Sequence, residues 1–131
     1  MENKKTAPPF FHVWIMEGLI MVHQYDLVIQ LSNSIEDDSN FQDNRINRGL
    51  IQRANTYRSF ALLKTGQIEA GKKTYSEIDP NEYNLFSNEY DKLFYAALEY
   101  FISRDDQIKR KGEQKAKELG YQKLFQMLLG L

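Results

Sequence analysis

The chain of 131 residues contains no cysteine. Disulfide bonds, thiolate metal sites, iron–sulfur clusters and cysteine nucleophiles are therefore excluded. Histidine is almost as scarce, since the chain has 2 histidines, too few for a three-histidine metal site. On one continuous helix, His12 and His23 would lie about 16 Å apart, which is too far for one metal ion. The sequence accordingly predicts neither a metal site nor a cofactor.

Sequence motifs of catalysis are also missing. The chain has no glycine-rich phosphate loop, no nucleophile elbow and no histidine–glutamate pattern of the metalloproteases. Asp105 and Asp106 are neighbouring carboxylates, but their place at a predicted helix start is typical of capping residues. Enzymatic chemistry on Asp105 or Glu17 would need a pocket that the sequence does not indicate. We therefore expect a non-enzymatic protein with no catalytic residue.

Neither sign of charge dominates, and the apolar run near the N-terminus is short. Lysine and arginine number 17 against 18 acidic residues, for a net charge of -1, which argues against nucleic acid as the main partner. The apolar run at residues 10–22 contains His12 and Glu17 and is shorter than the roughly 20 residues that cross a bilayer. No cleavage pattern of a secretory signal follows it. These features predict a cytoplasmic protein with no membrane partner.

Proline and glycine are few, and this scarcity favours helices. The chain has 3 prolines and 7 glycines, and no segment alternates apolar and polar residues as a strand does. Hydrophobic residues make up 42% of the chain, which is enough for one core. We therefore expect an all-α protein with a flexible leader at residues 1–9 and a single helical-repeat domain at residues 10–131.

Capping residues and apolar spacing set the expected helix boundaries. An acidic loop is expected at residues 36–44, after which Asp43 or Asn44 caps a long helix. Asp79, Pro80 and Glu82 have the order of N-cap, first helical residue and capping-box glutamate. The expected helices cover residues 10–22, 25–35, 46–64 and 68–78, a segment that begins at 79, and residues 88–103, 106–119 and 121–129.

Three turns divide these helices at regular intervals. They lie near His23, Gly66 and Arg104, with separations of about 43 and 38 residues, a spacing that is typical of helical repeats. The first two turns match residue by residue, because Gly18, Leu19 and Ile20 precede His23 as Ala61, Leu62 and Leu63 precede Gly66. Gly18 and Ala61 are small, and we expect each to let two antiparallel helices approach closely.

The segment around Gly66 resembles a tetratricopeptide repeat. Residues 61–70, followed by Tyr75 and the closing Ile78, Asp79 and Pro80, have the small, apolar, glycine, alanine, aromatic and proline order of that repeat, with shorter spacing between Gly66 and Pro80. The resemblance implies antiparallel helix pairs stacked as a short right-handed solenoid with a C-terminal capping helix. Residues 119–129, a leucine-glycine turn and a leucine-rich last helix, are similar to the C-terminal repeats of peptide-sensing bacterial regulators and of phage arbitrium receptors.

Proteins of that kind bind a short signal peptide in a concave groove, and their C-terminal region contributes to dimers. The resemblance therefore implies that this chain is a protein- or peptide-binding regulatory module, present as a homodimer or assembled with a larger repeat protein. The N-terminal helix-turn-helix of those regulators has no counterpart here, so the chain would be a truncated relative.

Two sets of residues are candidates for these contacts. If the helix pairs stack, the polar positions of two successive first helices line an inner face: Arg48, Gln52, Asn55, Lys92, Tyr95 and Glu99. The last helix is apolar on more than one side, and we expect it to be covered by an oligomer interface formed by Leu124, Phe125 and Leu128.

A basic segment supports an alternative function. Lys109, Arg110, Lys111, Lys115 and Lys117 form the densest basic patch, so a compact helical bundle could bind nucleic acid through residues 109–117. No aromatic residue is interleaved there for base stacking, which favours a solvated helix face. Gly112 within this segment costs about 1 kcal/mol relative to alanine and weakens the predicted helix.

Overall fold

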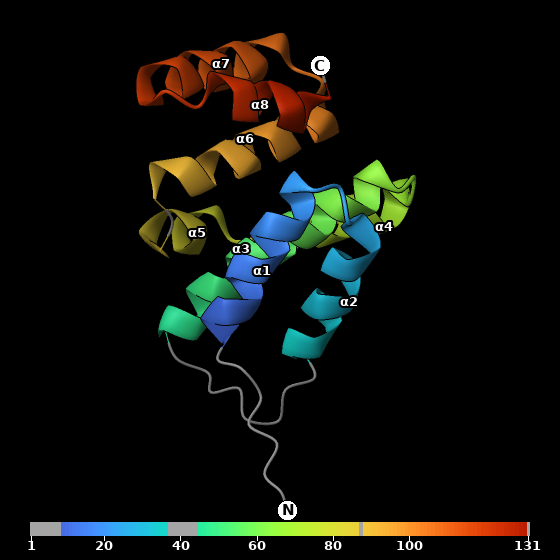
Figure 1. The fold of residues 1–131 in the computed structure, drawn as a ribbon. Coiled ribbons are helices and arrows are strands. Elements are labelled where there is room, and N and C mark those ends of the chain that lie inside the picture. Colours follow the sequence, from blue (N-terminus) through green and yellow to red (C-terminus); the bar gives the residue numbers. More distant parts are fainter. Residues whose placement is uncertain (1–8, 37–44, 87, 131) are drawn as a thin grey trace, which may run out of the picture. The chain divides into compact units, whose positions relative to one another are not determined.

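A computed structural model describes residues 9–36, 45–86 and 88–130, and all of its regular structure is helical (Figure 1). The prediction of an all-α protein is confirmed for these residues, which contain no strand. The helices are α1 (Pro9–Met21), α2 (Tyr25–Glu36), α3 (Arg45–Lys64), α4 (Ile68–Ser76), α5 (Pro80–Phe86), α6 (Glu89–Ser103), α7 (Asp106–Leu119) and α8 (Gln122–Leu129).

The helices gather into two compact units. Unit 1 spans Met1–Phe86 and contains α1 to α5, and unit 2 spans Ser87–Leu131 and contains α6 to α8. The sequence predicts one domain at residues 10–131, and the arrangement of the units as one solenoid stays a prediction. The predicted leader at residues 1–9 lies outside the described residues except for Pro9, as do most of the acidic loop and the caps Asp43 and Asn44.

The expected helix boundaries agree with the structure within about two residues, apart from the short α5, for which only the start was predicted. Asn88 caps α6, since its side chain accepts a hydrogen bond from the Asp91 backbone N–H at 2.8 Å and the Asp91 carboxylate accepts one from the Asn88 N–H at 3.3 Å. Asp105 caps α7 by accepting from the Gln107 N–H at 2.9 Å. Local sequence therefore sets these two helix starts.

Unit 1 is built around α3, which contacts α1, α2, α4 and α5. The side chains of Val13, Met16 and Ile20 of α1 are fully buried, and so are those of Tyr57 and Ala61 of α3. Ala54, Tyr57 and Ala61, which are spaced three and four residues apart on α3, are at most 4% exposed and form its buried side. The first helices of the two predicted pairs, α1 and α3, contact each other directly.

Two residues of α1 and α2 lie on exposed sides of their helices. Leu27 of α2 is 45% exposed, whereas the next residue, Val28, is fully buried. Gly18 of α1 is exposed, and an added methyl group would meet no heavy atom within 4 Å in the described part of the chain. The expectation that Gly18 lets two helices approach is therefore wrong. Gly71 of α4 has that role, because a Cβ there would lie 2.8 Å from the Leu63 side chain.

A buried polar cluster joins α1 to α3. The Tyr57 hydroxyl donates a hydrogen bond to Glu17 Oε2 at 2.5 Å, and the Arg53 Nη2 atom lies 3.6 Å from the same oxygen. Arg53 and Tyr57 are 8% and 0% exposed, so the carboxylate faces a positive charge and a donor away from bulk water. Paired in this way, Glu17 is tolerated on an otherwise apolar helix face.

The turns at His23 and Gly66 share one hydrogen-bond pattern. The His23 and Gly66 N–H groups donate to Ile20 and Leu63, and the next N–H groups donate to Leu19 and Leu62. This is the Schellman arrangement, which needs positive φ at the turn residue. The φ angles are 62° at His23 and 85° at Gly66.

The same pattern occurs a third time, at Gly120. Its N–H donates to Lys117, and the following N–H, of Tyr121, donates to Ala116. The third predicted turn, at Arg104, differs. Arg104 is left-handed, but the turn has the single hydrogen bond from the Arg104 N–H to the Tyr100 carbonyl in place of the Schellman pair. Five residues after each Schellman turn residue comes a buried position, namely Val28, Gly71 and Phe125.

Unit 2 consists of three helices that all contact one another. Leu93, Phe94, Ala97 and Leu98 of α6 are at most 1% exposed. Gly112 does not interrupt α7, because it is the place where Phe125 of α8 packs: a Cβ on Gly112 would overlap the Phe125 ring. The glycine therefore serves the close packing of α8 on α7.

The turn geometry predicts opposite effects for two glycine changes. A His23→Gly variant should raise the free energy of unfolding by about 1 kcal/mol, because a side chain in the left-handed region is strained. A Gly66→Ala variant should lower it by about the same amount for the same reason. Urea denaturation followed by circular dichroism measures both, and a shift of the same sign in the two variants would contradict this geometry.

Candidate binding site

A groove lies between α6 and α7 within unit 2. It has a volume of about 410 Å³ and is lined by residues of these two helices alone: Glu89, Lys92, Leu93, Ala96, Glu99, Ile108, Lys111, Gly112 and Lys115. Volumes of this size are typical of sites for small ligands or for a few side chains of a partner.

The spacing of the lining residues follows from helix geometry. On α6, Lys92, Ala96 and Glu99 are separated by four and three residues, so they share one side of the helix. Ile108, Lys111 and Lys115 have the corresponding three- and four-residue spacing on α7. The floor is apolar, with Leu93 buried at 1% exposure and Gly112 adding no side chain.

One end of the groove carries an ion cluster. Glu89 Oε2 lies 3.3 Å from Lys115 Nζ, and Glu89 Oε1 lies 3.7 Å from Lys92 Nζ. The three side chains are between 35% and 48% exposed, so these pairs contribute little to stability. Lys111 also lines the groove, where three lysines face two glutamates, and the local charge is therefore positive.

Glu99 is the titrating group with the most distinctive environment in the groove. Burial raises the pKa of Glu99 above its ordinary value, because the charged carboxylate loses contact with water. A carboxylate of this kind at the edge of an apolar floor can accept a hydrogen bond from a ligand. That hydrogen bond would offset part of the free energy that the charged group loses by leaving water.

An adjoining face of α7 presents part of the predicted basic patch. A surface depression of about 420 Å³ is lined by Arg110, Lys111, Gln114, Lys115 and Glu118. Lys109 does not share it, because its Nζ lies 5.7 Å from the centre of the Tyr100 ring on α6. The basic side chains of segment 109–117 are thus spread over more than one face of α7.

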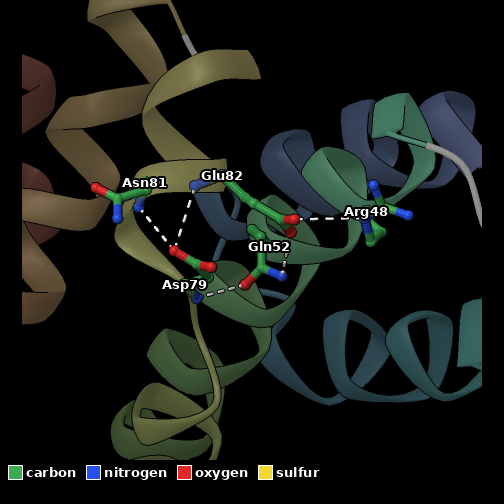
Figure 2. A network of polar contacts seen from close by, with 5 residues as sticks. All are labelled: Arg48, Gln52, Asp79, Asn81 and Glu82. Atoms are coloured by element: carbon green, nitrogen blue, oxygen red, sulfur yellow. Dashed lines mark hydrogen bonds and ion pairs between the residues drawn. The ribbon is translucent and has the colours of Figure 1, made fainter.

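Arg48 and Gln52, predicted to line an inner face, contact residues at the start of α5 (Figure 2). Gln52 Oε1 accepts a hydrogen bond from the Asp79 backbone N–H at 2.7 Å, and its Nε2 donates to Glu82 at 3.4 Å. Arg48 Nε lies 3.3 Å from the other oxygen of Glu82. Asp79 caps α5 as predicted, accepting from the Asn81 N–H at 2.9 Å.

The capping box predicted at this helix start is therefore rearranged. Glu82 turns to α3 rather than back to Asp79, and the Asp79 N–H is satisfied by Gln52. The third candidate on α3, Asn55, is half-buried. In unit 1, Arg48 and Gln52 thus together bind the N-terminal end of α5 to α3.

The candidates on α6 have a different placement. Lys92 and Glu99 both line the groove between α6 and α7, whereas Tyr95 is half-buried and is not part of that lining. The six predicted residues are accordingly divided between the two units, with Lys92 and Glu99 in one site. Their role in binding a peptide stays a prediction.

The residues predicted for an oligomer interface lie largely in the core of unit 2. Phe125 and Leu128 are each 1% exposed, and Leu124 is half-buried. The helices α6 and α7 contact α8 and bury these apolar side chains. An interface on Leu124, Phe125 and Leu128 stays a prediction.

Sequence reasoning missed Ala96, Ile108 and Glu89 as groove residues. Their spacing relative to Lys92 and Lys111 places them on the same sides of their helices. It identifies a groove only when these sides of α6 and α7 are known to face each other. Leu93 belongs to the core, and Lys111 and Lys115 belong to the predicted basic patch, and each of these residues also lines the groove.

Within the described residues, no group of three or more histidine, aspartate or glutamate side chains is arranged to hold a metal ion. None of the helices in this part of the chain is long and apolar enough to cross a bilayer. In comparisons with known proteins, no family model, no curated protein and no solved structure matches the chain. The resemblance to peptide-sensing regulators thus stays a prediction from the sequence.

Burial of Glu99 predicts a pH-dependent stability difference. Because its pKa is higher in the folded than in the unfolded chain, the ionised carboxylate opposes folding at neutral pH, and this cost disappears as the pH falls and the group is protonated. A Glu99→Gln variant should therefore be more stable than the parent at pH 7, by about 0.5 kcal/mol or less since the group is half exposed, and equal to it near pH 4.

Urea denaturation at the two pH values measures this difference. A Glu118→Gln variant, changed at an exposed position of α7, should differ little from the parent at either pH. Greater stability of the parent over Glu99→Gln at neutral pH would show that the carboxylate is favourably paired and would contradict the prediction.

Proposed function

We propose that the chain is a non-enzymatic regulatory module that binds a short peptide or an extended segment of a partner protein in the groove between α6 and α7. The observation that carries this proposal is the composition of that groove, with an apolar floor of Leu93, Ala96 and Ile108 and charged side chains at its edges. Such a site can bury one or two apolar side chains while its edges bind polar groups of the peptide. The proposal assigns no catalytic residue and no cofactor.

The charges of the groove favour a particular class of peptide. Lys92, Lys111 and Lys115 outnumber Glu89 and Glu99, so a carboxylate on the peptide is favoured near the ion cluster. Glu99 at the other end suits a neutral donor, because its burial raises the pKa and a proton or hydrogen bond stabilises it. We therefore propose a peptide with an apolar side chain next to an acidic group.

Recurrence of one packing pattern supports a repeat architecture. In unit 1 the pair α1 and α2 is contacted by α3, and in unit 2 the pair α6 and α7 is contacted by α8. Schellman turns join α1 to α2, α3 to α4 and α7 to α8. In the proposal these pairs stack as a short right-handed, tetratricopeptide-like solenoid that α8 caps.

The resemblance to peptide-sensing regulators supports a peptide as the ligand and the cytoplasm as the compartment. The chain would act as a relative of such regulators, by holding a signal peptide or by assembling with a larger repeat protein. A homodimer is part of the same proposal.

Selection from a library of random seven-residue peptides tests the proposed function. The full chain is immobilised, enriched peptides are synthesised, and each is titrated onto three forms: the parent, an Ala96→Trp variant that fills the groove, and an Ala70→Trp variant at an exposed position of α4. The expected result is enrichment of acidic–apolar peptides whose affinity falls at least about tenfold in Ala96→Trp, a loss of about 1.4 kcal/mol, and is unchanged in Ala70→Trp.

Two outcomes would contradict the proposal. One is the absence of any enriched peptide, and the other is a peptide whose affinity is the same for Ala96→Trp, which circular dichroism must show to be folded. The alternative function, nucleic acid binding through residues 109–117, rests on the exposed side chains of Arg110, Lys111 and Lys115. Binding of a DNA or RNA oligonucleotide that weakens steeply with salt and with Arg110→Gln, and not with Ala96→Trp, would favour it instead.

A further inference from the structure

We infer that the outer side of α1 is a self-association surface, on which a second copy of this chain docks through its own α1. This surface, called the α1 face below, consists of Trp14, Ile15, Gly18, Met21 and Val22. It is separate from the groove between α6 and α7, so self-association and peptide binding are tested independently, and it would supply the interface of the homodimer in the proposed function.

The α1 face is a strongly exposed apolar surface. Trp14 is 59% exposed, Ile15 49%, Met21 43% and Val22 61%. Trp14 and Met21 are seven residues apart, as are Ile15 and Val22, and Val22, the first residue after α1, still donates its N–H to Gly18, so the four side chains form two adjacent rows along one side of the helix and its end. Large apolar surfaces of this kind on a soluble protein mark interaction sites.

The face carries no charge that would select a charged partner. Its five residues are all uncharged, and the acidic residue of α1, Glu17, lies on the side that packs on α3, where it accepts the hydrogen bond from Tyr57. An apolar surface without charged groups is complementary to a copy of itself, and a two-fold dimer places the same surface on both sides of the interface.

Gly18 lies in the middle of the α1 face and is not needed for the packing of its own unit. A methyl group at this position would meet no heavy atom within 4 Å among the described residues. Glycine inside a helix is less favourable than alanine, so its presence here has no structural benefit within unit 1. A small residue does allow two helices to cross closely, and crossing at Gly18 would bring Trp14 and Val22 of one copy against the other.

The size of the face is that of a weak dimer. Four large side chains, each about half exposed, give an apolar area on the order of 400 Å² per copy, or about 800 Å² for two copies, and interfaces below about 1,200 Å² belong to transient complexes. We therefore expect association that depends on concentration rather than a permanent dimer.

The position of tryptophan provides a direct measurement, because Trp14 is the single tryptophan of the chain. Sedimentation equilibrium and tryptophan emission are recorded on the full chain from about 1 µM to about 1 mM, the range in which weak complexes dissociate. The expected result is a rise in mass from monomer to dimer and no further, with a shift of the emission to shorter wavelength over the same concentrations.

Three variants locate the interface. Ile15→Glu places a charge on the α1 face, and Gly18→Leu fills its centre with a good helix former where the monomer has open space. Both should raise the dimer dissociation constant at least about tenfold while circular dichroism stays unchanged. The matched control is Ile68→Glu on α4, where the isoleucine is 44% exposed, and it should leave the dissociation constant as it is.

The inference is overturned by any of three results. A monomer mass at all concentrations, whatever the emission wavelength, means that the face is covered within the chain or left in water. A dimer that Ile15→Glu and Gly18→Leu do not weaken lies elsewhere, for example on α8. A dimer that Ile68→Glu weakens equally does not depend on the α1 face.

Discussion

The packing of a third helix against each helix pair is the interaction on which the rest of this structure depends. Isolated helices shorter than about 12–15 residues are marginal in water, and α4 and α8 have 9 and 8 residues. Their stability must therefore come from buried contacts. In unit 1, α4 packs its buried Gly71 against Leu63 of α3, and in unit 2, α8 buries Phe125 and Leu128.

The same packing sets the geometry of the proposed binding site. Gly112 lines the groove between α6 and α7, and Phe125 of α8 packs against the same residue, in the space that a side chain there would occupy. The turn at Gly120 sets the direction in which α8 leaves α7, and in that direction Phe125, five residues later, is buried. A local feature, one left-handed glycine, thus contributes to the shape of a site that is formed by two other helices.

Features that depend on neighbouring residues were predictable from the sequence. The caps Asn88 and Asp105 and the turn residue Gly120 act within a few positions of themselves, so their residue types identify helix ends without knowledge of the fold. The left-handed conformation of Gly66 and the cap at Asp79 belong to the same class. These local rules were enough to place eight helices in the described part of the chain.

Features that depend on how helices face each other were not predictable. Gly18 and Ala61 occupy equivalent positions before their turns, yet Ala61 is buried and Gly18 faces open space. Gln52 has a polar side chain suited to an inner face, but its amide is engaged by Asp79 and Glu82. Ile108 is a groove residue only because α7 turns that side toward α6. To predict any of these contacts, one must know how two helices are rotated relative to each other. The periodicity of apolar residues does not give that rotation.

Hydrogen exchange of a Gly112→Ala variant tests most directly whether α8 and the pair α6 and α7 depend on each other. Alanine is the better helix former, so without tertiary packing the change would slow exchange in α7. Here the added methyl overlaps the Phe125 ring, and overpacking of this kind destabilises by about 1–3 kcal/mol. We expect faster exchange across α6, α7 and α8 together. Slower exchange confined to α7, with α6 and α8 unchanged, would contradict it.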